Sequence, residues 1–184
     1  MFIQTEETPN PETLKFIPGE EVLGAESSKY FKDAEAAQVS PLAVSLFSID
    51  GVESVYLASD FLTVTLKGHK WDNKKTEILS KIVNHYLSDQ PIIEDGAKID
   101  NNPELNDEIS IKINDIIEEK VRPAVARDGG DIIFNKFQDG IVYITMQGSC
   151  DGCPASEMTL KNGVENLLKH FVPEVDSVVP LQND

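Results

Sequence analysis

The sequence predicts an α+β protein made of two small domains that are joined by a polar linker. Three observations support this prediction. Both halves of the chain combine short β-rich runs with stretches whose apolar residues recur at helical spacing. Residues 90–106, between the halves, are polar and rich in residues that interrupt helices and strands. A chain of 184 residues also has room for two small cores. We therefore predict a first domain over residues 1–89, a linker over 90–106 and a second domain over 107–184.

The first domain is expected to begin with a β-hairpin. Strands are predicted at about 2–6 and 13–17, on either side of a proline-rich turn at 8–11. Proline holds its own φ and biases the preceding residue towards extended backbone, which favours a chain reversal there. Residues 20–40 are polar, and we expect them to be irregular apart from a short turn of helix near Ala34.

The rest of the first domain is predicted to form a short helix, a second hairpin and a long helix. Ser40-Pro41 is typical of a helix start, because serine caps free N–H groups and proline suits the first helical position. Asp50-Gly51 is expected to end that helix. We then expect strands at 52–58 and 61–67 across the turn Ser59-Asp60, and a helix from Trp71 to Ser88.

The second domain is predicted to have the element order α-β-β-α-β. We expect a helix from about Asp107, strands at 132–137 and 141–146, a helix from Pro154 to about Phe171, and a last strand at 175–179. The first of these helices should continue past Arg122-Pro123 with a kink. The run Asp128-Gly129-Gly130-Asp131 is interpreted as a turn that needs a positive φ.

The composition excludes several classes of partner. The chain has 32 acidic against 16 basic residues, a formal net charge of −16, which repels phosphate backbones and anionic membranes. We therefore expect no nucleic acid and no membrane as partner, and no apolar run approaches the ~20 residues of a spanning helix. The first residues lack the character of a signal or transit peptide, which favours a cytoplasmic protein.

Chemistry is concentrated in the only two cysteines, Cys150 and Cys153. Two thiols at this spacing hold one edge of a metal site or close a small disulfide. Pro154 suits the first position of a helix, which places Cys153 near the N-cap and Cys150 in the preceding loop. We expect both sulfurs to be exposed there, where the positive end of the helix favours thiolates.

Three functions remain open from these residues alone. A soft metal or an iron–sulfur cluster wants four ligands, and the histidines, His69, His85 and His170, lie too far apart in the sequence to form a ligand pair. Two copies of the chain would together supply four thiolates, the set that holds a 2Fe-2S or a 4Fe-4S cluster. The alternatives are a thiol-disulfide oxidoreductase that uses the Cys150/Cys153 pair, and a structural dimer bridged by zinc.

Longer motifs in both halves resemble one protein family. Residues 122–131, followed by 148–156 and Thr159-Leu160-Lys161, resemble the NifU-type (Nfu) scaffold domain. Residues 4–16 resemble the amino-terminal domain of the same Nfu proteins. The two resemblances come in the family's order and together cover nearly the whole chain.

The resemblance implies an iron–sulfur cluster carrier and not an enzyme. Cys150 and Cys153 match the cluster ligands of the family, so a homodimer would hold a 4Fe-4S cluster between its subunits, with 2Fe-2S as the alternative. The partners it implies are an upstream cluster donor and apo iron–sulfur proteins that receive the cluster. Lys161 is interpreted as a solvated surface lysine, with contact to the cluster or a partner as the alternative. Family members of organelles carry a presequence that we do not see, which favours a bacterial-type cytoplasmic protein.

Overall fold

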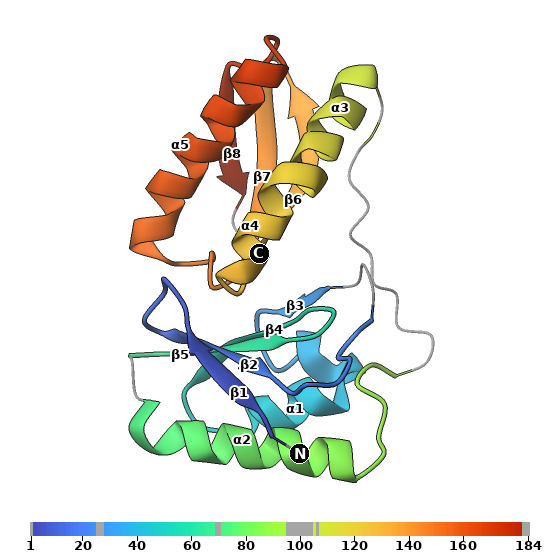
Figure 1. The fold of residues 1–184 in the computed structure, drawn as a ribbon, viewed down its shortest axis with the longest axis vertical. Coiled ribbons are helices and arrows are strands. Elements are labelled where there is room, and N and C mark those ends of the chain that lie inside the picture. Colours follow the sequence, from blue (N-terminus) through green and yellow to red (C-terminus); the bar gives the residue numbers. More distant parts are fainter. Residues whose placement is uncertain (1, 25–27, 69–70, 95–104, 106, 182–184) are drawn as a thin grey trace. The chain divides into compact units, whose positions relative to one another are not determined.

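The chain was analysed as a computed structural model that describes residues 2–24, 28–68, 71–94, 105 and 107–181, without the side chains of 154–157. Its contacts divide the chain into two compact units, Met1–Ile99 and Asp100–Asp184. Each unit combines helices with one β-sheet, which confirms the predicted α+β class (Figure 1). Most of the predicted linker, residues 95–104 and 106, lies outside the described residues.

The sheet of the first unit has five antiparallel strands in the order β1-β2-β5-β4-β3. Figure 1 shows helices α1 and α2 on one side of this sheet. The core between the layers includes Phe16, Leu46, Val64 and Ile78. The elements are β1 Gln4–Glu7, β2 Thr13–Ile17, β3 Lys29–Phe31, a 3₁₀ turn Ala36–Val39, α1 Pro41–Phe47, β4 Val52–Leu57, β5 Leu62–Leu66 and α2 Trp71–Leu87.

The irregular stretch expected at 20–40 contains an element that the sequence did not predict. Lys29–Phe31 forms strand β3, which pairs antiparallel with β4 through Tyr30 and Tyr56. Three residues are too few for a periodic signal, and the strand exists because β4 offers it backbone partners. The helical turn expected near Ala34 lies slightly later, at Ala36–Val39.

Ser40 begins α1 as predicted and also secures a later segment. Its Oγ accepts a hydrogen bond from the Ala43 N–H at 3.2 Å and donates one to the Ile92 carbonyl at 2.6 Å. The Glu94 N–H donates to the Val39 carbonyl at 2.9 Å. Residues 92–94, which the sequence assigned to the linker, are thus hydrogen-bonded to the first unit.

The second unit has the predicted order of elements and places three helices on one face of a three-stranded sheet (Figure 1). Strands β6 and β7 are antiparallel, and α5 returns the chain so that β8 lies parallel to β7. The core includes Ile117, Phe134, Ile144 and Leu168. The elements are α3 Glu108–Ile116, a π-helical turn Ile117–Val121, α4 Arg122–Arg127, β6 Gly130–Gln138, β7 Ile141–Gly148, α5 Pro154–Phe171 and β8 Ser177–Leu181.

The irregularity predicted around Arg122-Pro123 is the π-helical turn that precedes it. The Arg122 N–H donates to the Ile117 carbonyl, five residues earlier, and the chain then continues as α4. Proline has no N–H to give and its ring crowds the preceding turn, so a wider turn there relieves the clash.

Candidate metal centre

Cys150 and Cys153 lie on a short loop between the end of β7 and the start of α5. Cys153 is the N-cap of α5 and has extended backbone, with Pro154 in the first turn, as the sequence predicted. Gly148 and Gly152 adopt positive φ angles of 63° and 66°, which L side chains rarely accept. The loop also closes on itself, because the Asp151 N–H donates to the Gly148 carbonyl at 3.2 Å.

Both cysteine side chains are buried, which contradicts the prediction of exposed sulfurs. Cys150 is 4% exposed and Cys153 is 1% exposed. Cys150 packs in the core of the second unit, directly over Gly130, where an added Cβ would overlap its Sγ and lie 3.1 Å from its backbone nitrogen. Pro154 determines where helix α5 begins, but it does not determine which side chains bury the two cysteines.

The loop is bonded to the turn that leads into β6. The Ser149 N–H donates to the Gly129 carbonyl at 3.1 Å, and the Ser149 Oγ–H donates to the Asp128 carbonyl at 2.6 Å. Gly129 has a φ of 79°, which confirms the turn predicted at 128–131. The second glycine has another purpose, because Gly130 provides the space that Cys150 occupies.

The surroundings of Cys150 favour its protonated thiol. Burial raises its pKa to about 12, and the negative charges of Asp131 and Asp128 act in the same direction, while a hydrogen bond from Ser149 opposes them. The expectation that the start of α5 stabilises a thiolate is therefore wrong for Cys150 in this conformation. A cysteine binds a metal as its thiolate. Metal binding therefore requires the Cys150 sulfur to lose its proton and to become accessible.

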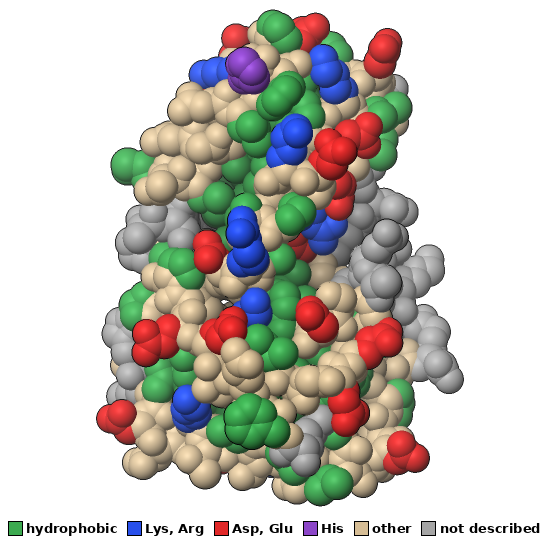
Figure 2. Space-filling view, in the orientation of Figure 1, with side chains coloured by type: hydrophobic (Ala, Val, Ile, Leu, Met, Phe, Trp, Pro, Cys, Tyr) green, Lys and Arg blue, Asp and Glu red, His purple; other side chains and the backbone are tan. Residues whose placement is uncertain are grey.

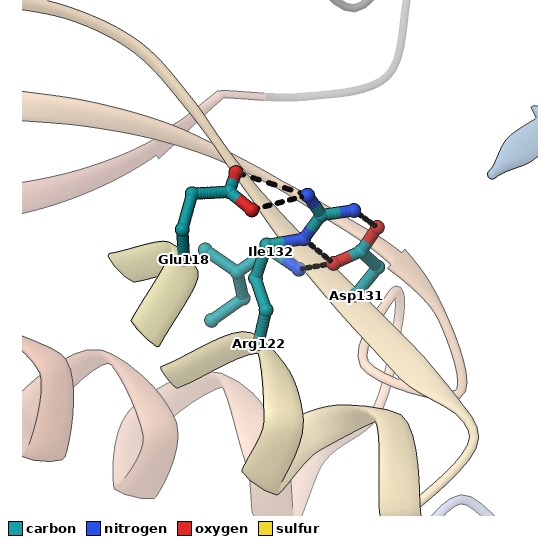
Figure 3. Close-up of polar contacts among 4 residues, drawn as sticks. All are labelled: Glu118, Arg122, Asp131 and Ile132. Atoms are coloured by element: carbon teal, nitrogen blue, oxygen red, sulfur yellow. Dashed lines mark hydrogen bonds and ion pairs between the residues drawn. The ribbon is translucent and has the colours of Figure 1, made fainter. Parts of the chain in front are cut away.

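An ion-pair network lies next to the turn beneath Cys150 (Figure 3). Asp131 is 3% exposed and accepts hydrogen bonds from Arg122 Nε at 2.7 Å and Arg122 Nη2 at 2.8 Å. The Asp131 carboxylate also accepts from the Ile132 N–H at 2.8 Å. On its outer side, Arg122 Nη1 donates to both carboxylate oxygens of Glu118, at 2.9 and 2.8 Å. The hydrogen bonds that Arg122 donates to Asp131, above all, raise the pKa of Arg122 beyond its usual value.

Sequence reasoning did not recognise Arg122, Asp131 and Gly130 as residues of the site. All three stand in the motif 122–131, which carried the family resemblance but was interpreted structurally as a helix and a turn. The available signal was the pair Gly129-Gly130, since one glycine satisfies a positive φ and a second one often marks a close approach of other atoms.

The remaining candidate ligands lie elsewhere. His85 is buried in α2 of the first unit, His170 lies in the last turn of α5, and His69 is outside the described residues. Among the described residues, no group of three or more His, Cys, Asp and Glu side chains is placed to hold a metal ion. Lys161 is half-buried on α5. The pKa of Glu165 is lowered mainly by its hydrogen bond from Lys169, and the charge of Lys161 makes a smaller contribution.

Two family models match this chain. The model described as "Scaffold protein Nfu/NifU N terminal" matches residues 3–89, and the model described as "NifU-like domain" matches residues 113–179. The chain belongs to the Nfu family of scaffold proteins. The resemblance found in the sequence is thereby confirmed, and a family of scaffolds agrees with the prediction of a protein that is not an enzyme.

Related proteins match this Nfu chain over nearly all of its length. The "NFU1 iron-sulfur cluster scaffold homolog, mitochondrial" of Drosophila willistoni is 44% identical over 181 residues, which cover 97% of this chain and 63% of the fly protein. The human protein of the same description is 42% identical over 187 residues, covering 100% of this chain and 73% of the human protein. Among solved structures, the NifU-like protein of Saccharomyces cerevisiae is 28% identical, covers 52% of this chain and 86% of that chain, and has a TM-score of 0.47.

The relatives correct one prediction. Both are described as mitochondrial, so the expectation of a bacterial-type cytoplasmic protein is wrong. That expectation was drawn from the composition of the first residues. Because this Nfu chain spans only 63% of the fly protein, that composition carries no information about the compartment.

Figure 2 shows acidic side chains spread over the visible face of both units, with lysine and arginine side chains among them. Within the described ranges, no helix combines the length and the apolar character that crossing a membrane requires.

Proposed function

We propose that this Nfu-type chain carries an iron–sulfur cluster as cargo, receives it from an upstream donor and delivers it to apo-proteins. Cys150 and Cys153 of two copies would hold a 4Fe-4S cluster between them, with a 2Fe-2S cluster as the alternative cargo. The observation that carries the proposal is the half-site: two cysteines stand together at a strand-to-helix junction, and no third ligand joins them among the described residues.

A half-site suits a carrier better than a permanent cofactor site. Two ligands from one chain leave the cluster incomplete, so it forms only where a second copy supplies the other two. The homodimer would accordingly form on cluster binding. When the copies part, each keeps only half of the ligand set, and the cluster is free to pass to a recipient with four ligands of its own.

Burial of the thiols makes loading a conformational step. Cys150 has to leave its position over Gly130 before its sulfur can reach a cluster shared with another chain. The loop is short, and its backbone has positive φ at Gly148 and Gly152. We expect these two glycines to let the loop rearrange. The closed conformation would then protect both thiols until a cluster is offered.

The oxidoreductase alternative is not favoured by this site. A catalytic thiol in that class is an accessible thiolate, whereas Cys150 is buried and its pKa is raised. The zinc-bridged dimer uses the same four thiolates, so experiment has to separate it from the cluster carrier.

Anaerobic reconstitution with iron and sulfide tests the proposal. We expect a brown protein with a visible absorption band, about four iron and four sulfide per two chains, and a dimer by sedimentation. Cys150→Ser and Cys153→Ser should each abolish cluster uptake and leave the far-ultraviolet circular dichroism unchanged. Lys169→Gln, at the far end of α5, is the matched control and should take up the cluster normally. A colourless dimer with one zinc, or full cluster uptake by either serine variant, would refute the proposal.

A further inference from the structure

The position of Cys150 depends on a turn that is distant in sequence. Its sulfur lies over Gly130, and the two hydrogen bonds from Ser149 attach the loop to the carbonyl groups of Asp128 and Gly129. We therefore expect the position of the cysteine loop to be coupled to the position of the 128–130 turn. Whatever holds this turn in place also holds Cys150 in place.

The turn is held on its β6 side by Asp131. This carboxylate is buried and accepts three hydrogen bonds, two from the Arg122 guanidinium and one from the Ile132 N–H. The two bonds from Arg122 are parallel and short, at 2.7 and 2.8 Å, which is the strongest geometry available to a carboxylate and an arginine. A buried carboxylate that loses such a partner is left with an uncompensated charge, so the pair resists separation.

The helical side of the contact is equally specific. The π-helical turn Ile117–Val121 widens the helix just before Arg122, and Glu118 lies one turn away at an i,i+4 spacing. Figure 3 shows the guanidinium between Glu118 and Asp131, with the planar group facing both carboxylates. Arg122 thus links the helix to the first residues of β6.

We propose that Arg122 and Asp131 are positioning residues for Cys150: their ion pair holds the 128–130 turn against the cysteine loop and keeps the sulfur seated over Gly130. The inference rests on the proposed function for the role of Cys150 as a cluster ligand. Within that function, the pair controls how readily the loop opens and presents Cys150 to a second copy. Arg122 and Asp131 need not touch the cluster to do this.

Thiol labelling of the cluster-free full chain tests the proposal. The chain is treated with N-ethylmaleimide under native conditions, and the modification of Cys150 and of Cys153 is followed separately by mass spectrometry. A buried thiol reacts through local opening, so its rate reports the stability of the closed loop. We expect Arg122→Gln to raise the rate at Cys150 at least about tenfold, because Asp131 loses its partner. Glu118→Gln, which leaves the buried pair intact, should change it less than about threefold, since its contact is exposed.

Hydrogen exchange of the same proteins separates positioning from general stability. If the pair positions the loop, exchange rises at residues 128–130 and 149–153, while the cores of β7 and α5 keep their protection. An unchanged rate at Cys150 in Arg122→Gln overturns the proposal. So does a rise at Cys150 that is matched by equal loss of protection throughout the second unit.

A milder variant decides the question if Arg122→Gln does not fold. Arg122→Lys keeps the charge but loses the planar two-pronged contact with Asp131. Faster labelling of Cys150 in this variant supports the proposal, and a wild-type rate overturns it. Because labelling uses the protein without its cargo, a failure to load a cluster would count against the proposed function and leave this result standing.

Discussion

Replacing Gly130 by alanine is expected to push Cys150 out of its position. A Cβ added at residue 130 would overlap the Cys150 sulfur. It would also lie 3.1 Å from the Cβ of Cys150 and 3.1 Å from the backbone nitrogen of Cys150. Gly130 is not among the described glycines with positive φ, so the cost arises from these contacts and not from backbone strain. Gly130→Ala therefore tests whether the close approach of loop and strand holds the sulfur.

The size of the effect follows from two opposing terms. Overpacking of a tight site costs about 1–3 kcal/mol. The lower conformational entropy of unfolded alanine returns about 0.5–1 kcal/mol. We expect Gly130→Ala to lower the free energy of unfolding of the second unit by up to about 2.5 kcal/mol and to accelerate labelling of Cys150. In a Cys150→Ala background the sulfur is absent, so most of this cost should vanish.

The assay needs a probe of the second unit. Trp71, the only tryptophan, lies in the first unit, so its fluorescence does not report on the second. Hydrogen exchange of β6 and β7 amides measures the required free energy. Gly163→Ala is the matched control: nothing lies within 4 Å of the added Cβ, and alanine in this helix should stabilise by about 0.5–1 kcal/mol. If Gly130→Ala is as stable as the wild type and labels Cys150 equally slowly, the close-packing argument is refuted.

Two further predictions concern the first unit. Burial lowers the pKa of His85, and its Nε2 has no hydrogen-bond partner among the described residues. Below pH ~6.5 the unfolded chain therefore binds a proton at His85 more readily than the folded chain does, so the free energy of unfolding falls as the pH falls. The urea midpoint followed by Trp71 fluorescence should fall from pH 7 to pH 5, and His85→Gln should flatten that dependence; an identical slope in both proteins would contradict this. Ser40→Ala removes the N-cap of α1, which accepts a hydrogen bond from the Ala43 N–H, and leaves the Ile92 carbonyl without its donor. It should cost about 1–2 kcal/mol in the same assay, whereas a loss below about 0.3 kcal/mol would contradict the capping role.

Short-range patterns in the sequence predicted most elements of both units. Ser40-Pro41 marks a helix start through its own side chains, and helix α1 begins at Pro41. Asp139 and Gly140 both adopt positive φ, at 52° and 78°, in the tight turn between the strands predicted at 132–137 and 141–146. The three-residue strand β3 was missed because it depends on pairing with β4, which a local pattern does not contain.

The sequence by itself determined where the candidate site lies and which two residues are its candidate ligands. Cys150 and Cys153 were recognisable from their spacing and from Pro154, since these act between neighbouring residues. Only the tertiary structure decided that both sulfurs are buried. Cys150 lies over Gly130, twenty positions before it in the sequence, and the residue beside Gly130, Asp131, pairs with an arginine of the preceding helix. Local patterns predict where the backbone turns, whereas burial and charge depend on which distant segments pack against it.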